Sequence, residues 1–142
     1  MIEKIRKVIM QEAGWLDIIE EIEKYLYDVR ELIKKGKYTL SLNDNRIDNK
    51  NLIDDYVVDS EIIKSIIFDL DIKDFSEKVK NEKEGRENEI LYIFGKEVKL
   101  LERYGIEEVT VPLYIKFNKL GNNYVIIISF HKQKYPIRYF FK

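Results

Sequence analysis

Four residues with reactive or polar side chains lie on two neighbouring stretches near the C-terminal end: Tyr114, Lys116, Ser129 and His131. A phenol, an ammonium group and an imidazole together suit cleavage of an RNA phosphodiester by its own 2′-hydroxyl. That reaction needs a general base, a general acid and a cation for the charged transition state. An imidazole titrates near neutral pH and serves as base or acid. A phenol positions the nucleophile, donates a proton or stacks on an unpaired base.

The two stretches are predicted to form a hairpin around Gly121-Asn122, which is typical of a two-residue turn. This turn would pair Leu120 with Asn123 and send alternate side chains to opposite faces. One predicted face is wholly apolar and must pack on helices. It comprises Val111, Leu113, Ile115, Phe117, Ile126, Ile128 and Phe130.

The opposite face of the hairpin is predicted to carry all four polar residues. Tyr114 is expected opposite Ser129, with Lys116 and His131 on the same surface. Each also has an ordinary explanation, because a lone histidine is more often a surface residue and a strand tyrosine is more often half-buried packing. Ser129 has no distinct chemical role. Their clustering on one basic face favours the functional interpretation.

The C-terminal third of the chain is basic. No acidic residue follows Glu108, whereas six of the 25 basic residues do. These are Lys116, Lys119, Lys132, Lys134, Arg138 and Lys142. Acidic residues are poor strand formers, which explains part of this asymmetry. The alternation of bases with aromatic residues favours an anionic partner, and we expect Lys132, Lys134 and Arg138 to hold RNA through charge.

Composition excludes several kinds of site. The chain has no cysteine, so disulfides, thiolate nucleophiles and cysteine-based metal sites are excluded, and a single histidine excludes a histidine-rich metal site. No cofactor is expected. No apolar stretch approaches the length of a membrane span, and charge at residues 3–6 disfavours a signal peptide. These features predict a soluble, cytoplasmic protein.

Helical periodicity dominates the first half of the chain. Apolar residues recur at three- and four-residue steps between Leu16 and Ile33, and Gly36 follows in the position that ends many helices. Gly14 is predicted to interrupt the chain before this helix, so residues 1–20 would include an extra N-terminal helix. The next predicted elements are an irregular connection over 37–58, a helix capped by Asp59 or Ser60 and ending near Leu70, a short helix from Asp71 or Asp74 through Val79, and a polar loop over 80–89.

The sequence from Ile90 onward predicts β-strands. The predicted strands are Ile90–Phe94, Glu97–Arg103, Val109–Asn118, Tyr124–His131 and Tyr135–Phe141, the last as an edge strand marked by its proline. Helices followed by strands indicate an α+β fold. We therefore predict one domain over residues 1–142, with the N-terminal helices on one face of an antiparallel, basic sheet formed by residues 90–142.

Three stretches in this order resemble the MqsR (motility quorum-sensing regulator) toxin family, a group of RelE-like mRNA interferases. The first is Val29–Lys37, which is similar to that family's opening helix and glycine stop. The second, Ile66–Leu70 followed by Asp74-Phe75, is similar to its hydrophobic helix. The third, Leu113–Lys116 followed by Val125–Phe130, is similar to the family pattern VYLKI…VLIVSF.

The resemblance implies a RelE-like toxin that cleaves single-stranded mRNA without metal, leaves a 2′,3′-cyclic phosphate and is silenced by a cognate antitoxin. By position, Tyr114 matches the family's catalytic tyrosine, and His131 falls where the family has a lysine. A second family lysine is replaced here by Glu77, with Lys78 adjacent as a further candidate for contact with the phosphate. Tyr92 is the nearest counterpart of the family's active-site glutamine and a candidate RNA contact.

Two other functions use the same basic face. The chain could be an RNA-binding module without catalysis, or a protein-interaction subunit whose basic strands or Tyr135–Phe141 edge receive an acidic partner strand. Cleavage of RNA separates the enzyme from both alternatives.

Overall fold

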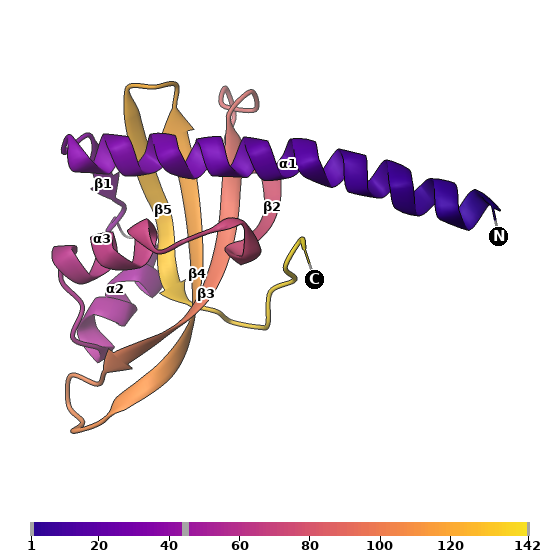
Figure 1. Cartoon of the computed structure of the whole chain (residues 1–142). Coiled ribbons are helices and arrows are strands. Elements are labelled where there is room, and N and C mark those ends of the chain that lie inside the picture. The colour runs from indigo at the N-terminus through magenta and orange to yellow at the C-terminus, as the bar shows by residue number, and fades with distance from the viewer. Residues whose placement is uncertain (1, 44–45, 142) are drawn as a thin grey trace.

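The computed structural model describes residues 2–43 and 46–141, and side chains from Gly14 onward. Within these residues the elements are α1 (Ile2–Lys34), β1 (Tyr38–Leu40), α2 (Ile47–Asp55), α3 (Ser60–Phe68), the short 3-10 helix η2 (Ile72–Asp74), β2 (Phe75–Lys80), β3 (Ile90–Leu101), β4 (Glu108–Leu120) and β5 (Tyr124–Lys132). Helices α1 and α3 lie on one side of a five-stranded sheet, and α2 packs against β5 (Figure 1). The strand order is β1-β5-β4-β3-β2. The α+β class is as predicted.

The first helix is longer than predicted. α1 runs without a break through Gly14, so the expected interruption and the separate N-terminal helix are wrong. One glycine costs a helix interior only about 1 kcal/mol, which neighbouring helix formers offset. At its other end α1 stops as predicted, because Gly36 adopts a φ of 73° that other residues rarely take. The buried stripe that follows the predicted periodicity includes Ile22, Leu26, Val29 and Ile33.

The helix predicted around Ser60 is confirmed, but the one predicted to run through Val79 is not. Asp59 caps α3, accepting a hydrogen bond of 2.9 Å from the backbone N–H of Ile62. The segment after it closes a single 3-10 turn with a capping box and then becomes β2, which pairs with β3. Edge pairing to a neighbouring strand outweighs helix propensity in this short, polar segment.

The sheet is mixed rather than antiparallel. β1 pairs in parallel with β5, whereas the other pairs are antiparallel. The sheet was expected to lie within residues 90–142, but it also includes β1 and β2, which precede this range. β3 is one continuous strand where two were predicted, and no strand is assigned to 135–141 in the described chain. That segment instead forms a C-terminal tail, residues 133–141, that follows β5.

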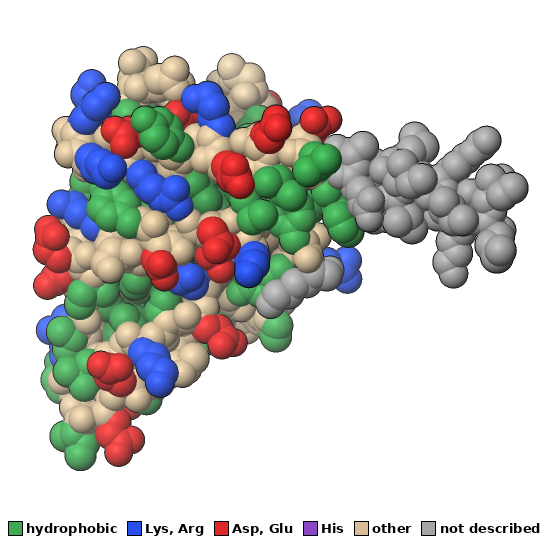
Figure 2. All heavy atoms as spheres, viewed as in Figure 1, with side chains coloured by type: hydrophobic (Ala, Val, Ile, Leu, Met, Phe, Trp, Pro, Cys, Tyr) green, Lys and Arg blue, Asp and Glu red, His purple; other side chains and the backbone are tan. Residues whose placement is uncertain are grey.

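One face of the sheet packs on α1 and α3 and forms the core. Alternate residues of β4 point to this face, and all four are buried as predicted: Val111, Leu113, Ile115 and Phe117. Figure 2 views the molecule from the helix side and shows acidic and basic side chains interspersed over its surface. We call this side of the sheet the helix face and the other side the open face.

The hairpin of β4 and β5 differs from the prediction in two ways that compensate. Its loop has three residues, since Leu120 pairs with Tyr124, and the side chains of Ile126 and Ile128 therefore point to the open face instead of the core. A β-bulge then shifts the register between Phe117 paired with Ile127 and Lys116 paired with Ser129. The total shift is two residues, which restores the predicted faces beyond the bulge.

Candidate functional site

Beyond the bulge, the predicted polar residues meet in one hollow on the open face, of about 280 Å³. It is lined by Arg46, Asp48, Tyr114, Lys116, Ser129, His131, Lys134, Tyr135 and Ile137. The pairs differ from the prediction, because Tyr114 lies opposite His131 and Lys116 lies opposite Ser129. The sharing of one surface by these four residues is nevertheless confirmed. We call this space the open-face hollow.

Tyr114 and His131 form a stacked pair in the lining of the hollow. Their ring centroids lie 5.2 Å apart and their planes differ by 14°. Nδ1 of His131 lies 2.9 Å from the carbonyl oxygen of Lys132. A carbonyl only accepts hydrogen bonds, so Nδ1 carries the proton and Nε2 of the neutral ring is left as an acceptor. The contact therefore fixes the imidazole in the tautomer that a general base requires.

The environment keeps the Tyr114 side chain in its phenol form. Burial raises its pKa above the ordinary value, and the nearby Glu77 carboxylate raises it further. Both effects disfavour a negatively charged phenolate. At neutral pH Tyr114 is consequently a hydrogen-bond donor beside His131.

Two cations line the hollow beside this pair. Burial lowers the pKa of the Lys116 ammonium, and the positive charge of Arg46 lowers it further, while Glu82 opposes this shift. Among the described residues, neither cation has a carboxylate within ion-pair distance. Lys134, in contrast, pairs with Asp48 at 2.9 Å. An anion that enters the hollow thus meets two cations not already neutralised.

Asn49 of α2 holds the bulge that orients His131. Its amide group donates hydrogen bonds to the carbonyl oxygens of Ser41 (2.8 Å) and Ile128 (2.9 Å), and its oxygen accepts from the N–H of Phe130 (2.8 Å). The side chain is 1% exposed, so water cannot replace these bonds. Where β1 ends, Asn49 therefore takes the place of a strand partner along β5.

The C-terminal tail forms one wall of the hollow. Gly95 of β3 lies under it, and a Cβ atom at this position would overlap the side chain of Ile137. The Gln133 side chain donates to the carbonyl oxygen of Leu113 (2.9 Å) and accepts from the N–H of Ile137 (3.3 Å). The glycine thus allows the tail to pack directly on the sheet and places Tyr135 and Ile137 beside Tyr114.

Lys78 and Tyr92 are not brought to this hollow. Both lie on the helix face, where the Lys78 amine is 2.9 Å from a Glu21 carboxylate oxygen and the Tyr92 hydroxyl donates to the same carboxylate at 2.7 Å. Tyr92 also stacks on Tyr25 at a centroid distance of 3.7 Å. Their contacts with α1 account for both side chains, and we leave them out of the candidate site.

The basic residues near the C-terminal end are spread over three places. Lys134 lines the open-face hollow, whereas Lys132 lines a neighbouring hollow beside α2 that His131 and Lys134 also border. Arg138 lies further along the tail, in a hollow next to Tyr114. Only Lys134 among these three therefore lines the open-face hollow itself.

The sequence did not indicate Arg46, Tyr135 or Ile137 as site residues. Arg46 precedes α2 in an Asn- and Asp-rich stretch that predicts an irregular connection, and its position depends on how α2 packs against β5. The other two belong to the segment predicted as an edge strand. The alternation of bases and aromatic residues there was a signal for function, but not for a tail over the open face.

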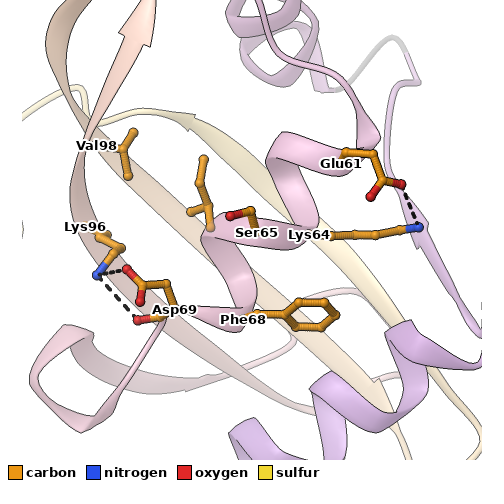
Figure 3. Close-up of a pocket in the computed structure, with 8 residues that line it drawn as sticks. Glu61, Lys64, Ser65, Phe68, Asp69, Lys96 and Val98 are labelled. Carbon is orange, nitrogen blue, oxygen red and sulfur yellow. Dashed lines mark hydrogen bonds and ion pairs between the residues drawn. The ribbon is translucent and has the colours of Figure 1, made fainter.

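A separate hollow, of about 450 Å³, lies on the helix side of the sheet between α3 and β3 (Figure 3). Its charged side chains are paired with one another: Lys64 lies 3.4 Å from Glu61, and Lys96 lies 3.5 Å from Asp69. Although this hollow is larger, its cations are already matched by carboxylates. It offers less to a charged ligand than the open-face hollow does.

Comparison with known proteins adds no assignment, because no family model, curated protein or solved structure matches the chain. The resemblance to the MqsR family stays a prediction. Over the described residues, no cluster of three or more metal-ligating side chains is found, and no helix has both the length and the apolar character needed to cross a membrane.

Proposed function

We propose that the protein is an endoribonuclease that cleaves single-stranded RNA without a metal ion. The observation that carries this proposal is the stacked Tyr114–His131 pair beside Lys116 and Arg46, two cations without carboxylate partners in the described chain. Acid–base groups next to unneutralised positive charge are what phosphodiester cleavage by a 2′-hydroxyl requires.

Each group has a role that its environment supports. The 2′-oxygen forms a bond to phosphorus while the bond from phosphorus to the 5′-oxygen breaks. Nε2 of His131 takes the 2′-hydroxyl proton, and the Lys116 ammonium, with its lowered pKa, protonates the departing 5′-oxygen. Arg46 and the Tyr114 phenol stabilise the non-bridging oxygens. The products are a 2′,3′-cyclic phosphate and a 5′-hydroxyl.

On the strength of the MqsR resemblance, we extend the proposal to a RelE-like mRNA interferase toxin of a type II toxin–antitoxin system. Its partners would be single-stranded mRNA and a cognate antitoxin, and its place of action the cytoplasm. The α+β arrangement is compatible with this assignment, and the basic C-terminal third supports an RNA substrate. His131 would take the place of a family lysine, and Glu77 that of a second.

The test is incubation of the purified protein with a defined single-stranded RNA in EDTA, beside Tyr114→Phe and His131→Ala. We expect discrete cuts, and a loss of about 10²-fold or more in rate for each variant. Tyr104→Phe is the matched control, because Tyr104 is 93% exposed at the β3–β4 turn and far along the strands from Tyr114. Folding of each variant is checked by circular dichroism.

Three results would overturn the proposal. Cuts that disappear in EDTA would assign the reaction to a metal, and cuts that persist in both variants would place the chemistry elsewhere. RNA that binds in a salt-sensitive manner without being cut would identify a non-catalytic RNA-binding module.

A further inference from the structure

A second, larger hollow of about 550 Å³ adjoins the open-face hollow, and the two share Tyr114, Tyr135 and Ile137 in their linings. The second hollow lies between the C-terminal tail and the strands β2 and β3. Its lining is Ser76, Glu77, Ile93, Tyr114, Tyr135, Pro136, Ile137, Arg138, Tyr139 and Phe140. A group bound there would be a direct neighbour of one bound against the Tyr114–His131 pair.

The walls of this second hollow suit a flat ring. Ile93 and Ile137 supply apolar surface, and Tyr135, which is 77% exposed, presents an aromatic ring that the protein interior does not cover. Exposed aromatic rings beside a phosphate site are typical platforms for unpaired bases. The tail is anchored there, because Ser76 donates to the carbonyl oxygen of Arg138 at 2.6 Å and the N–H of Phe140 donates to that of Phe75 at 3.0 Å.

One polar group in the hollow is able to select between bases. Glu77 pairs with Ile93 across β2 and β3, and its exposed carboxylate makes no ion pair or side-chain hydrogen bond with another described residue. An ionised carboxylate only accepts hydrogen bonds. The Watson–Crick edge of guanine offers two adjacent N–H donors, which match its two oxygens. Uracil presents carbonyl oxygens on both sides of its single N–H and would be repelled.

We propose that this second hollow is a nucleobase subsite that selects guanine next to the cleaved phosphate, with Glu77 reading the base edge and Tyr135 stacking on its face. This inference rests on the proposed ribonuclease function and adds its sequence preference. The Glu77 carboxylate lies in the hollow next to the one that contains Lys116 and Arg46. The N–H donors of the base would therefore face a carboxylate, while the phosphate of the same nucleotide faces two cations.

The experiment maps the ends of fragments that the full-length protein produces from a single-stranded RNA containing all four bases. We expect guanine to predominate at the nucleotide next to the cuts. Glu77→Gln should lower the preference for guanine over uracil about tenfold, within the range of a bidentate base contact. Tyr135→Ala should slow all cuts about tenfold, and Tyr135→Phe should restore them, because stacking needs only the ring. Glu84→Gln, in the exposed loop outside both hollows, is the charge-matched control.

Failure of this inference is distinguishable from failure of the proposed function. Cuts without a guanine preference, or with one that Glu77→Gln leaves unchanged, would overturn the subsite and leave the ribonuclease intact. If no RNA is cut, binding decides, using short RNAs that differ by one guanine-to-uracil exchange. Tighter binding of the guanine RNA that is abolished in Glu77→Gln would support the subsite, and equal affinities would overturn it.

Discussion

The two faces of the sheet treat their positive charges in opposite ways. On the helix face, three lysines have acidic partners: Lys78 with Glu21 at 2.9 Å, Lys96 with Asp74 at 3.4 Å and Lys119 with Asp28 at 3.7 Å. On the open face, Lys134 pairs with Asp48, but Lys116 and Arg46 line the same hollow with no such partner in the described chain. The cations on the helix face take part in ion pairs within the folded chain. On the second face, Lys116 and Arg46 are left available for a ligand, at a cost in stability.

The pKa values of two lysines on adjacent strands show this contrast. Burial opposes the charged form of both. For Lys96 the carboxylates of Asp74 and Asp69 outweigh burial and raise the pKa, whereas for Lys116 burial and Arg46 act together and lower it. The protein thus stabilises one ammonium group and destabilises the other.

The largest expected effect comes from neutralising each of these lysines. Lys116→Met should lower RNA cleavage by about 10²-fold, because it removes the proposed general acid, while leaving the melting temperature unchanged or higher. Lys96→Met should preserve cleavage and lower the melting temperature, since Asp74 loses its partner. Initial cleavage rates and thermal melts of both variants provide the comparison. Similar cleavage losses in the two variants would contradict it.

A smaller effect tests how the open face is built. Asn49→Ala should lower the free energy of unfolding by about 2 kcal/mol, because it leaves buried backbone groups of β5 without partners. Urea denaturation measures the change. Asn51→Ala, on an exposed position of the same helix, should change it by less than about 0.5 kcal/mol. Equal effects would mean that the bulge does not depend on Asn49.

The pH dependence of stability should have opposite signs for the two lysines. With its folded pKa lowered, Lys116 destabilises the protein at neutral pH, and this penalty is relieved as the pH rises from the folded pKa towards 10.5. Lys96, with its pKa raised, contributes stability below 10.5 that is lost as the pH rises through the folded pKa. The advantage of Lys116→Met over wild type should therefore shrink between neutral pH and 10.5, while the deficit of Lys96→Met persists there. Urea titrations at several pH values would show these trends, and parallel curves would refute them.

The smallest expected effect concerns RNA affinity. Removing a single cation that binds a phosphate should reduce the magnitude of the slope of log affinity against log salt by about 0.7. Arg46→Ala should show one such decrease in filter-binding titrations under conditions without cleavage. Lys24→Ala, on α1 and paired with Asp28, should show none. A decrease in both variants would mean that RNA does not distinguish the two faces.

The residues on the open face were predictable because side chains alternate between the two faces along a strand, and a register shift of two positions leaves each residue on the same face. A three-residue loop and one bulge each shift the register by one position, and together they return Tyr114, Lys116, Ser129 and His131 to one face. The bulge itself was not predictable from the hairpin, because its partner Asn49 lies on an element 79 positions before Ile128. Ile126, which lies between the loop and the bulge, and Ile128, the extra residue of the bulge, were therefore wrongly assigned to the core.

Periodicity could not predict the site residues that irregular segments contribute. Arg46 and Tyr135 lie outside the helices and strands, so no repeat of two or 3.6 residues fixes where they point. β2 was mistaken for a helix because its short, polar sequence gains its order from pairing with β3. Features that local periodicity determines were therefore predicted, whereas positions that depend on packing between distant segments were not.

The parallel pairing of β1 with β5 has a consequence for how the molecule folds. Val125 lies 87 positions after its partner Tyr38, and closing a loop of that length costs about 4 kcal/mol of chain entropy. Contacts between such distant segments form slowly and late. Arg46 and α2 follow β1 in the chain and help to line the open-face hollow. A chain in which β1 and α2 have not yet docked on β5 would therefore lack part of this hollow. Activity should then appear only with the last, slowest phase of refolding.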